Sequence, residues 1–371
     1  MKFAIFLVAN RSFMSKKSPK VIVAMSGGVD SSLSAVLLKK KGYDVVGVTM
    51  KLVEGSRCCD VEAVGHAAEV CKRYDIEHHV IDVSQEFDRV VVNYFISELA
   101  AARTPNPCVF CNRFLKFEQL FKIARKLGAD KIATGHYARV RKGRDGEWSL
   151  LKGKDGEKDQ SYYLCFLKEE WLSQILFPVG GYVKSEIYNL ARKEGLDFLV
   201  QKKQSQDLCF VDDKLRRSFI EKRLDNRPGE IVDLEGCVLG EHDGVHHYTI
   251  GQRKGLQVSG GAGPYYVVGF DVRRGHVIVS SDSESDELYR SVVDLRHVNF
   301  VSGQPSEDLK VMAKIRYQQK LSRAILKIGT KGAHSAQTVH LDFTKPQRAV
   351  TKGQIAVFYQ GEKCLGGGII K

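Results

Sequence analysis

The chain has 371 residues, of which 43% are apolar and 27% are charged, a balance typical of a soluble globular protein with two or three domains. It carries 57 Lys and Arg against 44 Asp and Glu, and the resulting net charge of +13 favours a polyanionic partner. No apolar run is long enough to span a membrane, so we expect no membrane partner. The nine cysteines lack the spacing of a small disulfide-rich domain, which argues against secretion and for a reducing cytoplasm.

The first 13 residues combine one lysine with a short apolar run, as a signal peptide does. The segment SKKSPK follows, and a predicted nucleotide-binding strand comes at once after it, which argues against export. We therefore expect residues 1–19 to be an upstream extension or a mobile arm.

The stretch VIVAMSGGVDSS (21–32) joins an apolar β-branched run to a Gly-Gly turn and a helical pattern. Residues 21–23 are typical of a buried parallel strand, and Gly27 and Gly28 allow a sharp turn close to a ligand. We expect residues 30–32 to cap the helix that follows. Main-chain N–H groups and the positive helix end would then form an anion site. The stretch lacks the lysine and the spacing of the ATPase P-loop, and SGGVDS resembles instead the loop of the ATP pyrophosphatases (PP-loop enzymes).

Strand and helix patterns alternate through the first half of the chain. Strands joined by helices predict a doubly wound parallel sheet, an α/β fold in which ligands bind at the carboxyl ends of strands. Met50 and Gly135 each follow a predicted strand and are therefore expected near the nucleotide. The predicted strands are 21–23, 44–50, 78–83 and 131–134, and the predicted helices are 33–38, 61–74, 87–102 and 184–194.

The segment TPNPCVFCNRFLK (104–116) carries two prolines that end the preceding helix and hold an exposed loop. Cys108 and Cys111 form a Cys-Xaa-Xaa-Cys pair just before a helix predicted to begin at Phe114. Near a helix start and beside Arg113 and Lys116, these thiols should have a lowered pKa, which makes them candidate nucleophiles. The pair alone is ambiguous between redox, zinc and iron–sulfur use, although the absence of a second pair argues against structural zinc.

Two further stretches could bear on function. Residues 139–158 form a charged hairpin pattern that leads into KDQSYY, and this is either a solvated hairpin or an edge that faces RNA. Cys209 lies in KQSQDLCFV (203–211), between apolar neighbours, where a cysteine is most often structural.

Beyond Arg216 glycines separate short strands, which indicates a small β-rich unit carrying HHYTIGQRKGL (246–256). That run is either a packed hairpin or an RNA contact. From about residue 291 the chain alternates in the pattern of a closing antiparallel β-barrel. We therefore divide the chain into residues 20–216 (pyrophosphatase domain), 217–284 (central β-rich domain) and 285–371 (C-terminal barrel).

The motifs SGGVDSS, TPNPxxxCN, ATGHYAR, KDQSYYL, SQDLCF and HYTIGQRKGL occur in this order. Together they resemble the tRNA-specific 2-thiouridylase family from Lys20 to the end of the chain. The resemblance implies an enzyme, a sulfurtransferase that replaces the C2 oxygen of the wobble uridine of tRNA by sulfur. ATP would adenylate that oxygen so that it leaves as AMP, with Mg²⁺ bridging the phosphates with the help of Asp30. The expected partners are glutamate, glutamine and lysine tRNAs, and a persulfide carrier protein or a cysteine desulfurase.

The resemblance also assigns roles to residues. Cys209 would carry the persulfide and Cys111 would be its partner thiol, the two ending each turnover as a disulfide. The expected nucleotide site comprises Ala24, Met25, Ser26, Gly27, Gly28, Val29, Asp30, Ser31, Met50 and Gly135. The expected tRNA contacts are His136, Lys158, Asp159, Gln160, Arg316, Tyr317 and Gln354.

One position departs from the family, because many members have an aspartate where this chain has Cys108. Cys108 could replace that carboxylate, act as a third redox thiol or ligate a metal. With Cys111 and Cys209 it would supply the three thiolates of an iron–sulfur cluster, so a cluster-dependent tRNA thiolase stays an alternative. The remaining alternative is another PP-loop tRNA-modifying enzyme.

Overall fold

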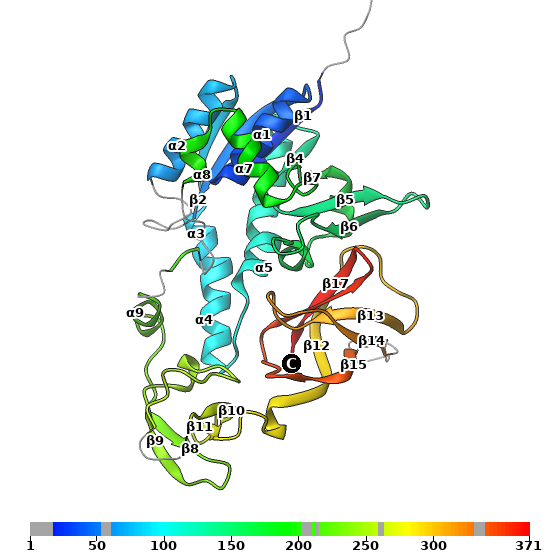
Figure 1. Cartoon of the computed structure of the whole chain (residues 1–371). Coiled ribbons are helices and arrows are strands. Elements are labelled where there is room, and N and C mark those ends of the chain that lie inside the picture. Colours follow the sequence, from blue (N-terminus) through cyan, green and yellow to red (C-terminus); the bar gives the residue numbers. More distant parts are fainter. Residues whose placement is uncertain (1–17, 53–60, 202–208, 212–214, 259–262, 330–337) are drawn as a thin grey trace, which may run out of the picture.

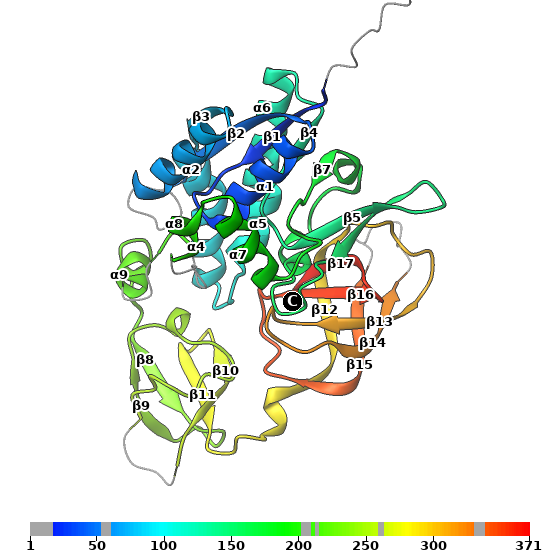
Figure 2. The same ribbon diagram turned by 45° about the horizontal axis from the view of Figure 1, so that its top comes forward.

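A computed structural model describes residues 18–52, 61–201, 209–211, 215–258, 263–329 and 338–371 of the chain. Residues 1–13 and most of the stretch 203–211 therefore lie outside the described residues. Figures 1 and 2 show a helix-covered sheet, a small β unit at the far end of the molecule and a barrel beside them.

The first unit is built on a five-stranded sheet in the order β3-β2-β1-β4-β7, and every pair in it is parallel. Apolar runs form its central strands, as expected for strands buried on both faces. The strands are β1 (Lys20–Ala24), β2 (Asp44–Lys51), β3 (Glu77–Asp82), β4 (Lys131–Ala133) and β7 (Ile175–Leu176).

Helices cover both faces of this sheet, so the expected doubly wound α/β fold is confirmed. Val21 and Val23 of β1 pack in one core cluster with residues of α1, α2 and α7. Ile22, which points to the other face, packs with α6. The helices are α1 (Val29–Lys40), α2 (Val61–Arg73), α6 (Phe117–Leu127), α7 (Lys184–Lys193) and the short α8 (Asp197–Val200).

A helical arm leaves the sheet between β3 and β4 and runs toward the other units (Figure 1). It contains α3 (Ser84–Phe87), the short π-helix η1 (Asp88–Val92) and α4 (Asn93–Ala100). It returns through α5 (Pro107–Cys111) and a second π-helix, η2 (Asn112–Lys116). The expectation that the cysteines precede a helix starting at Phe114 is wrong. Pro107 occupies the first turn of α5, where its missing N–H costs nothing, so both cysteines lie inside the helix.

The central unit is a four-stranded sheet in the order β10-β11-β8-β9. Its apolar side chains, including Ile231, Val267 and Val277, form a small core of their own. The strands are β8 (Gly229–Val232), β9 (Val238–His242), β10 (Tyr266–Asp271) and β11 (His276–Ser280), and α9 (Arg216–Glu221) precedes them.

The C-terminal unit is a closed six-stranded antiparallel barrel, as expected, because β12 pairs with both β15 and β17. The hairpin β5–β6 from the first half of the chain extends the same sheet by pairing Leu150 and Leu151 with β17. The sequence did not indicate this shared sheet. The strands are β5 (Ala138–Lys142), β6 (Trp148–Lys152), β12 (Tyr289–Phe300), β13 (Leu309–Lys314), β14 (Ser322–Ile328), β15 (Val339–Arg348), β16 (Ile355–Gln360) and β17 (Lys363–Ile370).

Short 3-10 helices complete the described structure. They are η3 (Ser161–Leu164), η4 (Glu169–Gln174), η5 (Val245–His247) and η6 (Asp286–Leu288). No helix among the described segments is long and apolar enough to cross a membrane.

Candidate active site

The loop between β1 and α1 is a tight turn stabilised by its own serines. The hydroxyl of Ser31 accepts a hydrogen bond from the main-chain N–H of Ser26 (3.1 Å) and donates one to the carbonyl oxygen of Gly28 (3.0 Å). Gly28 is the N-cap of α1, and no side chain caps this helix end, so the expected capping by residues 30–32 is wrong. The first N–H groups of α1 are therefore available to an anion rather than held by a cap.

At two positions of this region only glycine fits, because a Cβ atom would collide with neighbouring main-chain atoms. Gly27 has φ +68°, and a Cβ there would lie 2.1 Å from the carbonyl oxygen of Ala63. A Cβ on Gly135 would lie 2.6 Å from the main-chain nitrogen of Ser31. Gly135 thus lets the end of β4 approach the first turn of α1, as expected from its place after a strand.

A cavity of about 250 Å³, here called the loop cavity, opens beside this turn. Most of the residues expected at the nucleotide site line its wall. Gly27, Gly28 and Val29 are not on its wall, and the side chain of Val29 is buried in the sheet core instead. Expected residues on its wall are Ala24, Met25, Ser26, Asp30, Ser31, Met50 and Gly135, joined by His136 and Gln160, which were expected to contact tRNA.

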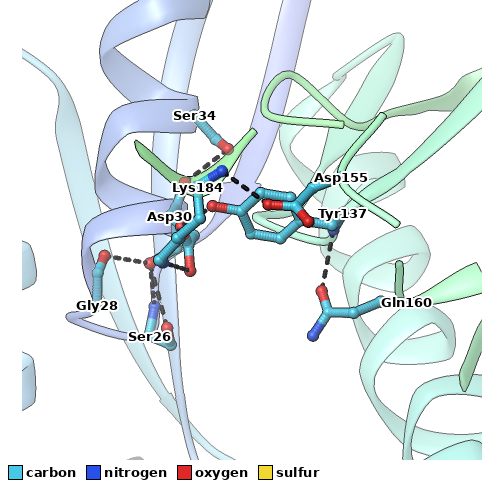
Figure 3. Close-up of polar contacts among 9 residues, drawn as sticks. Ser26, Gly28, Asp30, Ser34, Tyr137, Asp155, Gln160 and Lys184 are labelled. Carbon is cyan, nitrogen blue, oxygen red and sulfur yellow. Dashed lines mark hydrogen bonds and ion pairs between the residues drawn. The ribbon is translucent and has the colours of Figure 1, made fainter. Parts of the chain in front are cut away.

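Asp30 is the centre of a polar network that links α1, the segment before β5 and α7 (Figure 3). Its carboxylate accepts hydrogen bonds from the ammonium of Lys184 (2.7 and 2.8 Å) and from the hydroxyl of Tyr137 (2.6 Å). Lys184 is only 8% exposed, and burial lowers its pKa while the charge of Asp30 opposes that shift. Its main-chain N–H also donates to Asp155, which accepts from the N–H of Lys158 as well. The network therefore connects the loop cavity to the 155–160 turn.

His136 faces the loop cavity as a neutral group. Burial, with a smaller contribution from the charge of Lys116, lowers its pKa to about 3. One ring nitrogen, Nδ1, lies 2.8 Å from the hydroxyl of Thr134. The side chain therefore offers a fixed, uncharged imidazole to whatever fills the cavity.

A second and larger cavity of about 590 Å³, the interdomain cavity, is lined by all three units. Asp30 and Gln160 form part of both cavities, so the two are neighbours. The 155–163 segment, the helical arm, the central unit and the barrel supply the rest of the wall. It holds Lys158, Gln160, Arg316, Tyr317 and Gln354, which were expected to contact tRNA, together with Asn106, Tyr163 and Thr249, which were not.

Two tyrosines form an aromatic face in the interdomain cavity. The ring centroids of Tyr163 and Tyr317 lie 4.5 Å apart with a tilt of 37°. Lys314 fixes Tyr317 by donating to its carbonyl oxygen (2.8 Å) and by lying over its ring. An aromatic face beside cations and amides is suited to stack and hydrogen-bond an unpaired base.

Asp159 has a different place from its neighbours in KDQSYY. It is 7% exposed, and its carboxylate accepts hydrogen bonds from the N–H groups of Gly153 and Ser161 and from the Ser161 hydroxyl. These bonds hold the turn that presents Lys158 and Gln160 to the cavity. Asp159 therefore acts on the site through the backbone, and its side chain does not line either cavity.

The two expected reactive thiols belong to one apolar cluster beneath the helical arm. Cys111 is buried, and Cys209 is partly exposed and packs against the same cluster. Phe210, next to Cys209, contacts the rings of Phe87 (5.4 Å) and Phe95 (5.7 Å). Met50 packs on this cluster and also lines the loop cavity, so the thiol cluster borders the loop cavity.

Cys108 lies one helical turn before Cys111 and is less buried than it. Within the described ranges, no group of three or more His, Cys, Asp or Glu side chains is arranged to hold a metal ion. The three cysteines named from the sequence therefore do not form a metal site as they stand.

Sequence reasoning missed Lys184, Tyr137 and Tyr163. Lys184 begins a helix that was predicted only as an amphipathic element, and its distance in sequence from Asp30 gives no local signal. Tyr137 and Tyr163 are each part of a quoted motif, ATGHYAR and KDQSYYL, so those motifs were the available signal.

Family models match nearly the whole described chain. They are a tRNA methyl transferase HUP domain over residues 19–213, a tRNA methyl transferase PRC-barrel domain over 217–281 and an aminomethyltransferase beta-barrel domain over 290–370.

Full-length relatives are also similar. The tRNA-specific 2-thiouridylase MnmA of Acidithiobacillus ferrooxidans is 46% identical over 95% of this chain and 98% of its own length. That of Staphylococcus aureus is 38% identical over 96% of both chains. Among solved structures, the U34-tRNA thiolase NcsA of Methanococcus maripaludis is 20% identical and covers 56% of this chain and 64% of its own, with a TM-score of 0.35, too low to support any inference.

Proposed function

This chain belongs to the family of tRNA-specific 2-thiouridylases, and from that premise we propose that it replaces the C2 oxygen of the wobble uridine of tRNA by sulfur at the expense of ATP. The loop cavity would hold ATP and the interdomain cavity the uridine. The single observation that carries this assignment is that Asp30 and Gln160 line both cavities. A phosphate in one cavity and a base in the other would thus meet at a common wall.

The β1–α1 turn suits the phosphates of ATP. Its N–H groups and the positive end of α1 would stabilise the negative charge that develops as pyrophosphate leaves. Lys116 on the cavity wall and Lys184, buried beside Asp30, supply positive charge near this turn. The base of ATP would rest against Met50 and the apolar part of the wall.

Mg²⁺ fits this site only in part. Among the described residues, Asp30 is the one carboxylate on the wall of the loop cavity, and its oxygens already accept bonds from Lys184 and Tyr137. The ion would therefore be held mainly by phosphate oxygens and water, with Asp30 as the protein ligand. When bound, it would neutralise the phosphate charge.

We propose that uridine stacks on the Tyr163–Tyr317 face, flipped out of the anticodon loop so that its C2 oxygen reaches the α-phosphate of ATP. Lys158 and Arg316 are placed to bind RNA phosphates, and Gln160 and Gln354 to hydrogen-bond the base. Attack of the C2 oxygen on the α-phosphorus forms an adenylated uridine and releases pyrophosphate. The oxygen can then depart as part of AMP.

Sulfur would come from a persulfide on Cys209. In one route the terminal sulfur attacks C2, AMP leaves, and the Cys111 thiolate attacks the inner sulfur of Cys209. In the other, Cys111 first displaces hydrosulfide, which then attacks C2. Both routes form one C–S bond and a Cys111–Cys209 disulfide, and an external thiol must reduce that disulfide before the next turnover. The shared apolar cluster of the two cysteines supports their approach.

The same family membership supports a proposal for the tRNA substrates and the sulfur donor. We propose glutamate, glutamine and lysine tRNAs as substrates, and a persulfide carrier protein or a cysteine desulfurase as the sulfur donor. A cytoplasmic setting would keep the thiols reduced between turnovers.

A second candidate mechanism uses an iron–sulfur cluster, and the presence of three thiols at the site favours keeping it. Cys108 and Cys111 lie one turn apart on α5, and Cys209 packs near Cys111. As described above, these groups do not form a ready metal site, so we assign no step to a cluster. Iron and sulfide analysis of protein purified without oxygen tests it, since an active, iron-free protein is incompatible with a cluster.

The proposed function is tested by nucleoside mass spectrometry. The full chain is incubated with ATP, Mg²⁺, an unmodified glutamate tRNA, and a cysteine desulfurase with cysteine as the persulfide source, and the digested RNA is searched for 2-thiouridine. The product should appear, vanish without ATP, and be absent with Cys111→Ser. Formation of adenylated RNA without 2-thiouridine would support the first step and reject the assigned sulfur chemistry. Neither product from folded protein would reject the function.

A further inference from the structure

A third cavity, of about 340 Å³, lies in the central unit between α9 and the 243–257 segment. We call it the central cavity. Its wall includes Arg216 and Arg217 from α9 and His246, His247 and Tyr248 from the HHYTIGQRKGL run. The reaction proposed above uses none of these residues.

Two imidazoles in this cavity have polar atoms that the fold leaves unsatisfied. The Nε2 atoms of His246 and His247 are buried and have no hydrogen-bond partner. Their ring centroids lie 4.2 Å apart. Burial lowers the pKa of both groups, that of His247 to about 4, so both rings are neutral at pH 7. A buried polar atom without a partner is costly, and a ligand that supplies partners would recover that cost.

The charges around the cavity indicate what kind of ligand fits. Arg217 is paired with Glu221 (2.8 Å) and with Asp243, so its charge is largely compensated. Asp243 itself lines the cavity and would repel a bare anion. Arg216, in contrast, is exposed at the rim. The interior thus offers neutral donors and acceptors while the rim offers a cation, which matches a nucleotide, with its base or ribose inside and its phosphate at the rim.

The central cavity adjoins the interdomain cavity. Thr249 lines both of them. Its hydroxyl lies 3.2 Å from that of Thr104, which ties the central unit to the start of the Cys-Xaa-Xaa-Cys segment. An RNA strand with one nucleotide in the interdomain cavity would pass a neighbouring nucleotide over Thr249.

We propose that the central cavity is a second nucleotide subsite, which takes an unpaired nucleotide of the same RNA beside the one that reacts. His246 and His247 read its base or ribose edge, and Arg216 binds its phosphate. This inference rests on the proposed function, because it assigns the occupant from the RNA substrate.

The test is equilibrium binding of unmodified tRNA to the full chain at one fixed salt concentration. The double variant His246→Ala/His247→Ala should bind about tenfold more weakly, because it loses buried hydrogen bonds to the nucleotide. Arg216→Ala, an exposed change that leaves the core intact, should weaken binding severalfold. Arg274→Ala, which removes an exposed charge of the same unit away from the cavity, is the matched control and should bind like the unchanged protein.

RNA changes identify the occupant. Unpaired anticodon-loop nucleotides are replaced one at a time by abasic ones. At one position the abasic nucleotide should weaken binding of tRNA to the unchanged protein. The same change should not weaken binding to the double histidine variant any further. Binding of the histidine and Arg216 variants within twofold of the unchanged protein, or additive effects at every abasic position, would overturn the proposal. In that case 2-thiouridine formation by the unchanged protein shows that the proposed function survives. If the unchanged protein neither binds nor thiolates tRNA, both fail.

Discussion

Replacing Asp30 by Asn should destabilise the protein through Lys184. Lys184 is 8% exposed, and its ammonium donates two hydrogen bonds to the Asp30 carboxylate, at 2.7 and 2.8 Å. Asparagine keeps the shape but removes the charge, so the buried ammonium loses its counter-charge. Breaking a buried pair in this way costs about 3–5 kcal/mol. The Asp30 side chain is 26% exposed, which places the expected loss in the free energy of unfolding near the lower end, about 3 kcal/mol.

The second change isolates the cause. In Asp30→Asn/Lys184→Met no buried charge is left, so stability should return to within about 1 kcal/mol of the unchanged protein. Asp44→Asn, which removes an exposed carboxylate, is the control and should have little effect. Stability is measured by urea denaturation with tryptophan fluorescence.

The pH dependence gives an independent check. Burial already lowers the pKa of Lys184, and without Asp30 that pKa falls further below its value in the unfolded chain. The unfolded state then binds more protons, so the stability of Asp30→Asn rises with pH, and its deficit should be smaller at about pH 9.5 than at about pH 7. A loss below about 1 kcal/mol, or a double variant no more stable than Asp30→Asn, would refute the reasoning.

Four further predictions follow from other features. Gly27→Ala should abolish ATP binding, measured by calorimetry, because its Cβ would lie 2.1 Å from a main-chain oxygen, whereas Gly42→Ala, with φ +84° but nothing within 4 Å, should bind ATP normally. Cys108→Ser should retain 2-thiouridine formation if two thiols suffice, and lose both activity and iron if a cluster operates. The pKa of His136 is lowered to about 3 in the folded protein, so below about pH 6.5 the unfolded chain binds a proton that the folded protein does not, and the free energy of unfolding should fall. In urea titrations His136→Asn should make this fall smaller. Glu98→Gln should cost about 2 kcal/mol in unfolding free energy, because the buried Glu98 carboxylate accepts charge-assisted bonds from two partly exposed arginines; a cost below about 0.5 kcal/mol would contradict this.

The sheet-forming segments could be predicted from sequence because their signals are local. The apolar run before Gly27 and the amphipathic pattern of α7 each predict one element from its own residues, and the alternation after residue 291 predicts the strands of the barrel. The start of α5 was misplaced because proline was interpreted only as a helix breaker, although its fixed φ also suits a first turn.

The rest of the site depends on contacts between distant segments. Lys184 meets Asp30 only because α7 packs beside α1, and no residue near either one signals the pair. The same holds for Tyr163 and Tyr317, which come from the first unit and the barrel. Local sequence could describe the part of the loop cavity between Ala24 and Ser31, because those residues lie on one continuous strand, turn and helix start, whereas Met50 and Gly135 come from the ends of two other strands.

The hairpin β5–β6 has a consequence for how the molecule can move and be divided. Because β6 pairs with β17, main-chain hydrogen bonds join the first unit and the barrel in one continuous sheet. A fragment ending near residue 216 would carry an unpaired strand edge into water, where it invites aggregation. The central sheet, in contrast, pairs with no strand of the other two sheets in the part of the chain that the structure describes. Any hinge that admits a large substrate should therefore lie at the central sheet, and the other two units should move together.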